Sequence, residues 1–270
     1  MNQVFNTSRA WLMFRKYFGE NKKAYALLFL ASGASLTLLM GVHLTFSNPN
    51  LFEETGQVLY YFSGLILWGC LSASLLFSDL GSKSKGINYL LLPASSLEKL
   101  MCTVFFGIVV YFIGYNLIFY AVDFTMVSLA NEKFNTSWSV IDVFAINQYK
   151  SKLFEDGHTS YFFYTHFALQ SFFLLGSIYF PKYGFFKTAI ALVLVWVLMI
   201  LYLVVFMNNV APRGLIYDGM SFLEVFDSSG RNKFVPLPSG LTGTVKFFFE
   251  YAVAVWFWVI AYYRLKEKEV

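Results

Sequence analysis

The chain has 270 residues, of which 57% are hydrophobic and only 13% are charged, and its net charge is +4. Because soluble domains contain roughly 25% charged residues, this composition excludes an ordinary soluble globular protein. The small net charge gives no indication of nucleic-acid binding. The lipid bilayer is therefore the expected solvent of this chain.

The first predicted element lies within residues 1–23 and is a cytoplasmic amphipathic helix over 8–21 that leads into the first span. Its aromatic residues recur at three- and four-residue spacing: Trp11, Phe14 and Phe18. The neighbouring Arg15 and Lys16 are placed to reach lipid phosphates. A solvated tail with chance periodicity is the alternative. The apolar residues are interrupted too often to form the core of a signal peptide.

Six apolar runs predict six membrane-spanning helices, because about 20 apolar residues cross the roughly 30 Å hydrocarbon core. The runs cover residues 24–46, 57–77, 100–122, 161–180, 188–207 and 247–263. Glu250 is the one Lys, Arg, Asp or Glu within them and lies near the end of its run. The sequence thus predicts an all-α integral membrane protein, with a six-span transmembrane domain over residues 24–270.

The distribution of basic residues predicts the orientation. Segments 1–23, 78–99, 181–187 and 264–270 hold 13 of the 20 Lys and Arg residues. The positive-inside rule therefore places these segments and both termini in the cytoplasm, as expected for a multi-pass protein of the cell's inner (plasma) membrane. The two cysteines fall within predicted spans, so neither a disulfide nor a metal site is expected.

Two long segments on the outer side, 123–160 and 208–246, are too apolar for simple linkers and are predicted to be small folded loops. The pattern within Ser137 to Phe154 indicates a short helix. Phe222 to Phe226 and Phe234 to Leu237 flank a turn-forming Asp-Ser-Ser-Gly sequence, which predicts a hairpin.

The cytoplasmic loop 78–99 carries the most informative pattern. Lys83 and Lys85 face the cytoplasm in this interpretation, and Ile87 to Leu92 is an apolar segment too short to cross a membrane. Pro93 ends that segment, because its ring disfavours a helical conformation in the preceding residue.

The next helix has a strong start signal. Ser95 or Ser96 is able to cap it, with Glu98 in its first turn, where an acidic side chain is favourable. A short apolar helix presented toward the cytosol requires burial against a partner protein or the membrane surface.

This loop resembles the one in ATP-binding-cassette transporter permeases of the type-2 exporter class. The matching positions are Lys85-Gly86-Ile87, Leu92-Pro93-Ala94-Ser95 and Leu97-Glu98-Lys99. The predicted layout is similar as well, with an amphipathic first helix, six spans and cytoplasmic termini. The motif covers a small part of the chain, and the layout covers all of it in outline.

The resemblance implies a coupling helix that docks on a separate ATPase subunit, which binds ATP and Mg. Gly86 to Leu92 would touch the ATPase, with Lys83, Lys85, Glu98 and Lys99 at the rim. The implied coupling residues are Lys83, Lys85, Gly86, Ile87, Tyr89, Leu90, Leu91, Leu92, Pro93, Glu98 and Lys99. Because six spans make half a transporter, a homodimer or a pairing with a related permease is implied.

Within the predicted spans, Asn116, His166 and Gln170 are the polar candidates for lining a translocation path. The alternative is that they only hold helices together, as a buried amide does across a helix contact. Gly107 and Gly114 lie seven residues apart on one face and predict a close helix contact.

Catalytic patterns are not found in the sequence. The three histidines, His43, His158 and His166, have no zinc-binding spacing, and no P-loop is present, so no cofactor is expected in this chain. Two hypotheses remain. The first is the permease subunit of an exporter; the alternative is a non-transporting assembly, immunity or sensory subunit that binds a cytosolic partner through the same loop. An intramembrane enzyme is disfavoured.

Overall fold

The computed structural model describes residues 5–46, 52–143, 160–180, 182–209 and 247–269, with residues 240 and 244 and three short strands. Among these residues, four helices are long and apolar enough to cross a membrane: Thr7–Thr45, Glu54–Leu75, Ser96–Phe134 and Gly184–Tyr202. This supports the membrane class expected from the composition.

Two of the six predicted spans do not meet the same criterion. α6 (Ser160–Tyr179) covers the predicted span 161–180, and the π-helical η5 (Phe248–Ala252) with α9 (Val253–Glu269) covers 247–263. α6 interrupts its apolar residues with Ser, Thr, His and Gln, and α9 ends in a run of charged residues. A six-span topology therefore remains a prediction.

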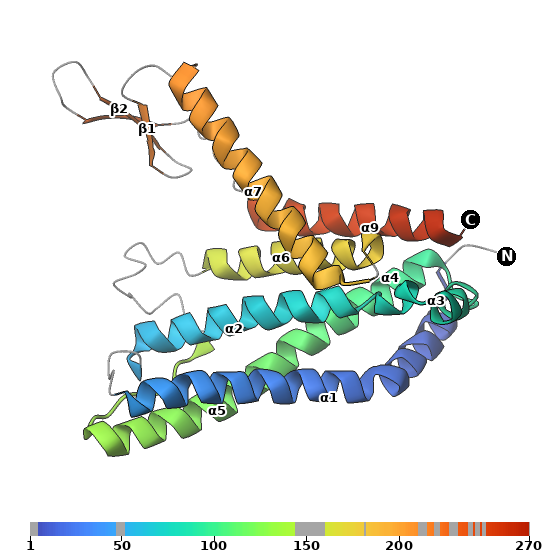
Figure 1. Ribbon diagram of the computed structural model, residues 1–270, viewed down its shortest axis with the longest axis horizontal. Coiled ribbons are helices and arrows are strands. Elements are labelled where there is room, and N and C mark those ends of the chain that lie inside the picture. Colours follow the sequence, from blue (N-terminus) through green and yellow to red (C-terminus); the bar gives the residue numbers. More distant parts are fainter. Residues whose placement is uncertain are drawn as a thin grey trace.

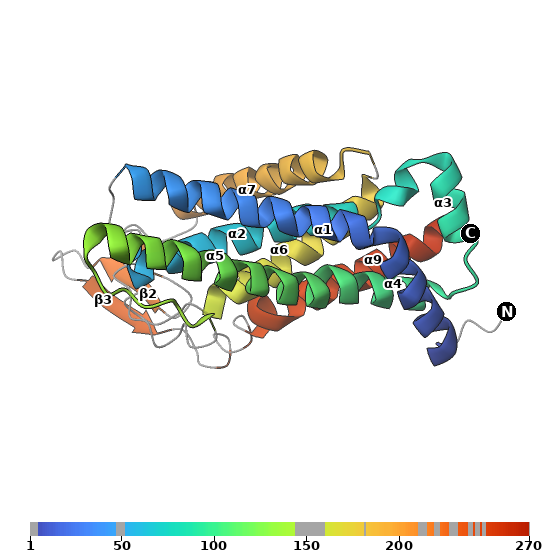
Figure 2. The same ribbon diagram turned by 90° about the horizontal axis from the view of Figure 1, so that it is seen from below.

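Most helices run side by side in one bundle, whereas α7 (Gly184–Asn209) leaves it at an angle (Figures 1 and 2). α2 (Glu54–Leu75) packs against α6, α6 packs against α9, and α1 (Thr7–Thr45) packs against α5 (Tyr111–Phe134). Small residues permit this close approach. A Cβ atom at Gly114 would overlap the ring of Phe29, and one at Gly107 would overlap Leu76, which agrees with the predicted helix contact.

α1 is one helix of 39 residues, not an amphipathic helix followed by a separate span. The Asn6 side chain caps it by accepting from the backbone N–H of Ser8. Its N-terminal turns pack on the protein, because the rings of Phe14 and Tyr17 lie 5.6 Å and 4.9 Å from that of Phe106. The aromatic residues that the sequence predicts on one face of this helix therefore differ in their surroundings, since Trp11 stays 69% exposed while Phe14 is partly buried.

The third candidate span is also longer than predicted. It runs without a break through α4 (Ser96–Val104), the π-helical η3 (Phe105–Val110) and α5, and ends at Asn135, whose φ of 52° is the left-handed conformation that terminates helices. The predicted outer loop 123–160 therefore begins as helix. Asp123, assigned to that loop, is fully buried.

The helix predicted within Ser137 to Phe154 is wrong over residues 137–142, which are not helical; most of the remainder lies outside the described residues. Side chains satisfy the backbone there in place of helical hydrogen bonds. Gln57 Oε1 accepts from the N–H of Ile141 (2.9 Å), and Asn131 accepts from the N–H of Trp138 and donates to its carbonyl, both at 2.9 Å. These partners hold the segment against α2 and α5.

The three strands form one antiparallel sheet in the order β1-β2-β3. They are β1 (Leu215–Asp218), β2 (Phe222–Phe226) and β3 (Asn232–Pro236). β2 and β3 pair with Phe222 opposite Pro236 and Phe226 opposite Asn232, at the place where the sequence predicts a hairpin.

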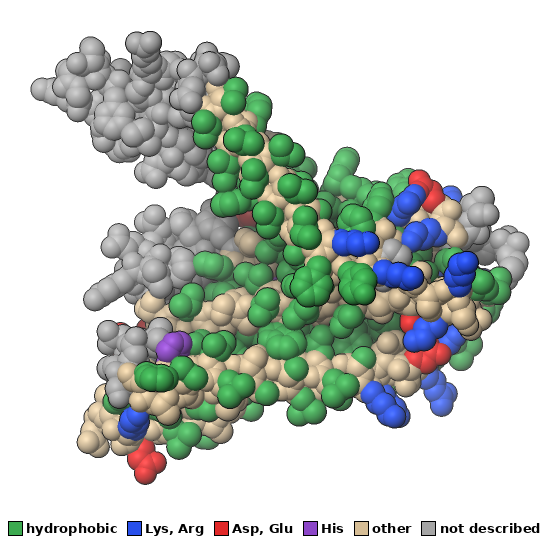
Figure 3. Space-filling model, viewed as in Figure 1, with side chains coloured by type: hydrophobic (Ala, Val, Ile, Leu, Met, Phe, Trp, Pro, Cys, Tyr) green, Lys and Arg blue, Asp and Glu red, His purple; other side chains and the backbone are tan. Residues whose placement is uncertain are grey.

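Charged side chains are segregated along the bundle. Figure 3 shows Lys and Arg gathered at the end that carries α3 (Lys83–Leu90) and the N-terminal turns of α1, while hydrophobic side chains cover its length. We call this end of the bundle the α3 end.

Candidate functional site

The loop at the α3 end is a compact structure. A short 3₁₀ turn, η2 (Ser78–Gly81), precedes α3, and Ser82 caps α3 by accepting from the N–H of Lys85 at 3.3 Å. Lys85 Nζ lies 3.6 Å from a carboxylate oxygen of Asp79. Gly86 is buried against η2, since its Cβ position is 3.5 Å from Leu80 Cα. The inner side of α3 is therefore fixed by the protein itself.

Glu98 lies in the first turn of α4, as the sequence predicts, but not at the rim of the loop, where the resemblance implied it. It is 0% exposed and accepts from the N–H of Ser95 (2.8 Å) in a capping box, and from the N–H of Asn6 (2.7 Å). Arg9 Nη2 also donates to it at 3.2 Å. A buried carboxylate requires such partners, so Glu98 ties the start of α1 to the start of α4.

Lys99 is likewise buried, at 1% exposed, and not at the rim. Its Nζ donates to the carbonyl of Leu90 at 2.9 Å and lies 5.7 Å from the ring centroid of Tyr89. Tyr89 in turn packs edge-on against Phe77, which lies two residues beyond the end of α2. Lys99 thus holds the last turn of α3 on α4.

The outer side of α3 is a small exposed patch. Lys83, Ile87 and Leu91 are four residues apart and so share one helix face. Ile87 is 56% exposed and Leu91 75% exposed. We call these three residues the α3 patch. Of the other predicted coupling residues, Lys85 and Pro93 are exposed, and Tyr89, Leu90 and Leu92 are partly buried.

The three candidate path residues are all buried at helix contacts. Asn116 accepts from Tyr61 Oη at 3.1 Å and donates to the carbonyl of Phe112 at 2.7 Å. Gln170 Nε2 donates to the carbonyl of Gly107 in η3 at 2.6 Å. These amides join α5 and η3 to α2 and α6.

His166 lies one turn from Gln170 and is 1% exposed. Its ring stacks near that of Tyr111, with a centroid distance of 6.1 Å. A Cβ atom at Gly69 would overlap the imidazole, so this glycine provides the space for it. His166 and Gln170 of α6 thus face the same continuous helix, His166 at Tyr111 and Gln170 at Gly107. Asn116 lies more than one turn beyond Tyr111 and contacts α2 instead.

Two tyrosines are buried where α5 packs on α2, and the sequence did not predict this role for them. Tyr111 and Tyr115 are fully buried and donate to the carbonyls of Leu65 and Tyr61 on α2, at 3.0 Å and 2.9 Å. Gly64 leaves room for the hydroxyl of Tyr115. Tyrosines four residues apart in the middle of an apolar run are the signal that could have identified them.

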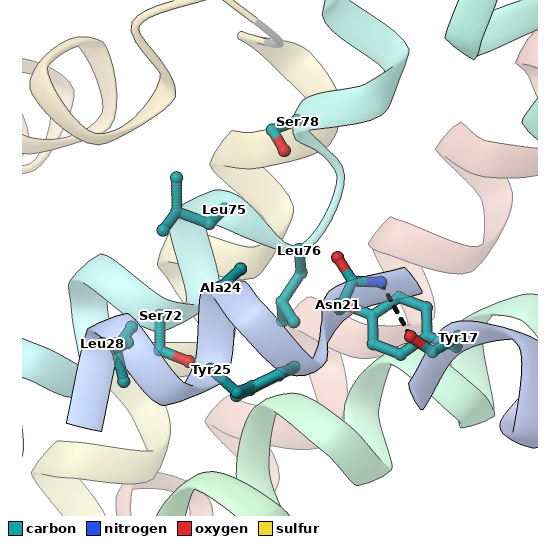
Figure 4. Close-up of a pocket in the computed structure, with 9 residues that line it drawn as sticks. All are labelled: Tyr17, Asn21, Ala24, Tyr25, Leu28, Ser72, Leu75, Leu76 and Ser78. Carbon is teal, nitrogen blue, oxygen red and sulfur yellow. Dashed lines mark hydrogen bonds between the residues drawn. The ribbon is translucent and has the colours of Figure 1, made fainter. Parts of the chain in front are cut away.

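Three of the cavities among the described residues lie near the α3 end. Figure 4 shows one of about 130 Å³ between α1 and α2, where Asn21 donates to the carbonyl of Tyr17 at 3.0 Å. It is lined by Tyr17, Asn21, Ala24, Tyr25, Leu28, Ser72, Leu75, Leu76 and Ser78, none of which is charged. The other two, of about 160 Å³ and 320 Å³, lie between α1 and the loop containing α3. These cavities could not be predicted from the sequence, because the N-terminal helix was expected to lie apart from the bundle.

The last turns of α9 are tied to α6. Lys268 Nζ donates to the carbonyl of Ile178 at 2.6 Å, and Arg264 pairs with Glu267 at 2.6 Å. Burial, assisted by the charge of Arg264, lowers the pKa of Lys268 below its usual value. This part of the chain is fixed by polar contacts as well as by apolar packing.

Metal-binding and reactive groups are sparse in the described residues. Among them, no three His, Cys, Asp or Glu side chains form a group that could hold a metal ion. Cys70 and Cys102 are free and buried, and burial makes a thiol unreactive. In comparisons with known proteins, no family model, curated protein or solved structure matches this chain.

Proposed function

We propose that this chain is the membrane-spanning permease subunit of an ATP-binding-cassette exporter, driven by a separate ATPase that docks on α3. The observation that carries the proposal is the α3 patch. Two large apolar side chains, Ile87 and Leu91, project from a short helix at the strongly basic end of the bundle. Exposed apolar groups at a polar end are suited to burial against a protein partner.

The attachment of α3 supports a role in transmitting motion. Glu98 links the loop to the first turn of α1, and Lys99 links it to α4. A force on the α3 patch would therefore move α1 and the long helix Ser96–Phe134 together. ATP-driven changes in the ATPase would then shift the permease between two states that bind cargo differently.

The proposed topology has six spans, with α6 and α9 crossing beside the four longer helices. The α3 end and both termini lie in the cytoplasm in this proposal, because basic residues favour that side of the inner membrane. Two copies, or one copy and a related permease, make the full transporter. α7 offers an apolar surface for such a neighbour or for lipid, since most of its side chains are exposed.

The test is to purify the tagged full-length protein from its native membrane in mild detergent and to identify any ATPase that copurifies. An Ile87→Asp, Leu91→Asp variant should lose the ATPase and its hydrolysis of ATP. The matched control is Ser84→Asp, Asn88→Asp, which adds the same charge to exposed positions of the same helix. If the ATPase is absent from the wild type, or is retained by the first variant, the coupling proposal fails.

A non-transporting subunit is the second candidate. Its support is that Asn116 and Gln170 are both engaged in helix contacts, as expected of packing residues. Such a subunit would still bind a cytosolic partner through α3. Nucleotide-stimulated transport in vesicles that hold the copurified complex separates the two candidates, because only the exporter moves cargo when ATP is added.

A further inference from the structure

One of the three cavities at the α3 end combines apolar walls with two cations. It measures about 160 Å³ and lies between α1 and the segment that follows α3. Leu12, Met13, Leu92, Pro93 and Ala94 supply its apolar lining. The two remaining lining residues are Arg9 and Lys16, and none of the seven is acidic. We call this cavity the α1 groove.

The two cations are well placed for an anion. Arg9 and Lys16 are seven residues apart on α1, which is two turns, or about 10 Å along the axis. Lys16 pairs with Glu20 at 3.8 Å, but both groups are exposed, so the pair contributes little and is easily exchanged. Arg9 Nη2 donates to Glu98 at 3.2 Å, and the Arg9 side chain is 31% exposed, so part of this cationic group is accessible from the groove.

The surroundings of the α1 groove are those of a membrane–water boundary. Trp11 and Phe18 are exposed on the same helix, and tryptophan is enriched at such boundaries. Basic side chains gather at this end, next to the hydrophobic side chains that cover the rest of the bundle (Figure 3). A groove where basic and apolar side chains meet has the chemistry to hold both a lipid headgroup and the start of an acyl chain.

We propose that the α1 groove binds an anionic phospholipid of the bilayer. The lipid phosphate lies between Arg9 and Lys16, and the first part of an acyl chain packs on Leu12, Leu92 and Pro93. The cavity of Figure 4 has no charged lining residue and therefore lacks this chemistry. The bound lipid bridges α1 to the α3 loop. The proposal does not depend on the exporter function.

Native mass spectrometry of the purified full-length protein tests the proposal. Phosphatidylglycerol and phosphatidylcholine with identical acyl chains are the probes, and the retained lipid is counted for each. Phosphatidylglycerol should be retained and phosphatidylcholine lost. Lys16→Glu should weaken phosphatidylglycerol binding about tenfold, because it reverses one of the two charges that hold the phosphate. Lys22→Glu is the matched control, since it makes the same charge change at an exposed position of α1 outside the groove, and it should change binding less than about twofold.

A second variant separates the lipid from a free anion. Ala94→Phe fills the apolar part of the groove without changing charge, and it should also reduce binding of phosphatidylglycerol. Equal retention of the two lipids by the unaltered protein would overturn the proposal, as would an equal effect of Lys22→Glu and Lys16→Glu. Displacement of the lipid by inorganic phosphate would show that the groove recognises only the anion and would also overturn it.

Discussion

Replacing Glu98 by alanine should release the first turns of α1 from α4. The substitution removes the acceptor for the backbone N–H of Asn6 and Ser95 and for Arg9. Loss of a helix cap costs about 1 kcal/mol. Loss of a hydrogen bond to a charged group costs about 1.5–3 kcal/mol, and the lower value applies because Arg9 is 31% exposed. The free energy of local opening should fall by about 2.5 kcal/mol with alanine, and by roughly half as much with glutamine, which keeps one acceptor.

Thiol labelling measures this opening directly. Cys102 is 0% exposed and packs with Met13 of α1, whereas Cys70 lies in a different cluster on α2. Each thiol is followed alone, in the Cys70→Ala or Cys102→Ala background. With about 1.4 kcal/mol for each factor of ten, labelling of Cys102 should accelerate about 60-fold in Glu98→Ala and just under about tenfold in Glu98→Gln. Labelling of Cys70 should change less than threefold.

Two outcomes would refute this reasoning. An unchanged labelling rate at Cys102 would mean that Glu98 does not hold α1 on α4. An equal acceleration at both thiols would mean that the substitution destabilises the whole bundle, so that the contact is not a local one.

Two further substitutions test the helix contacts. Gly64→Ala should lower the thermal midpoint in detergent, because a Cβ atom would overlap the hydroxyl of Tyr115 and overpacking costs about 1–3 kcal/mol. The control is Gly41→Ala, where the added Cβ atom meets nothing within 4 Å. This variant should be as stable as the unaltered protein or slightly more stable. A drop in both variants would point to a general intolerance of alanine. Gln170→Leu should cost about 1 kcal/mol, since the carbonyl of Gly107 loses its donor. Transport that is abolished while stability is unchanged would contradict a packing role and favour a path role.

The sequence by itself determined the class of the protein and several helix boundaries. Apolar runs of about 20 residues must satisfy their backbone groups internally in lipid, so they form helices wherever they lie in the chain. Local signals were also sufficient at the α3 loop. Of the two candidate caps, Ser95 is the one used, with Glu98 completing the capping box as the third helical residue. Such signals act over three or four residues and need no tertiary context.

The tertiary structure decided which polar residues are buried. The sequence places Glu98 in the first turn of a helix but does not indicate its burial, because its partner Asn6 is 92 positions away. Gln57 likewise shows no sign of its partner, because Ile141 is 84 positions away. The continuity of α1 has the same origin, since its N-terminal turns gain a packing surface only where α4 lies beside them. Contacts between distant segments carry no local pattern. The division of the α3 loop into a buried base and an exposed patch could therefore be found only in the folded chain.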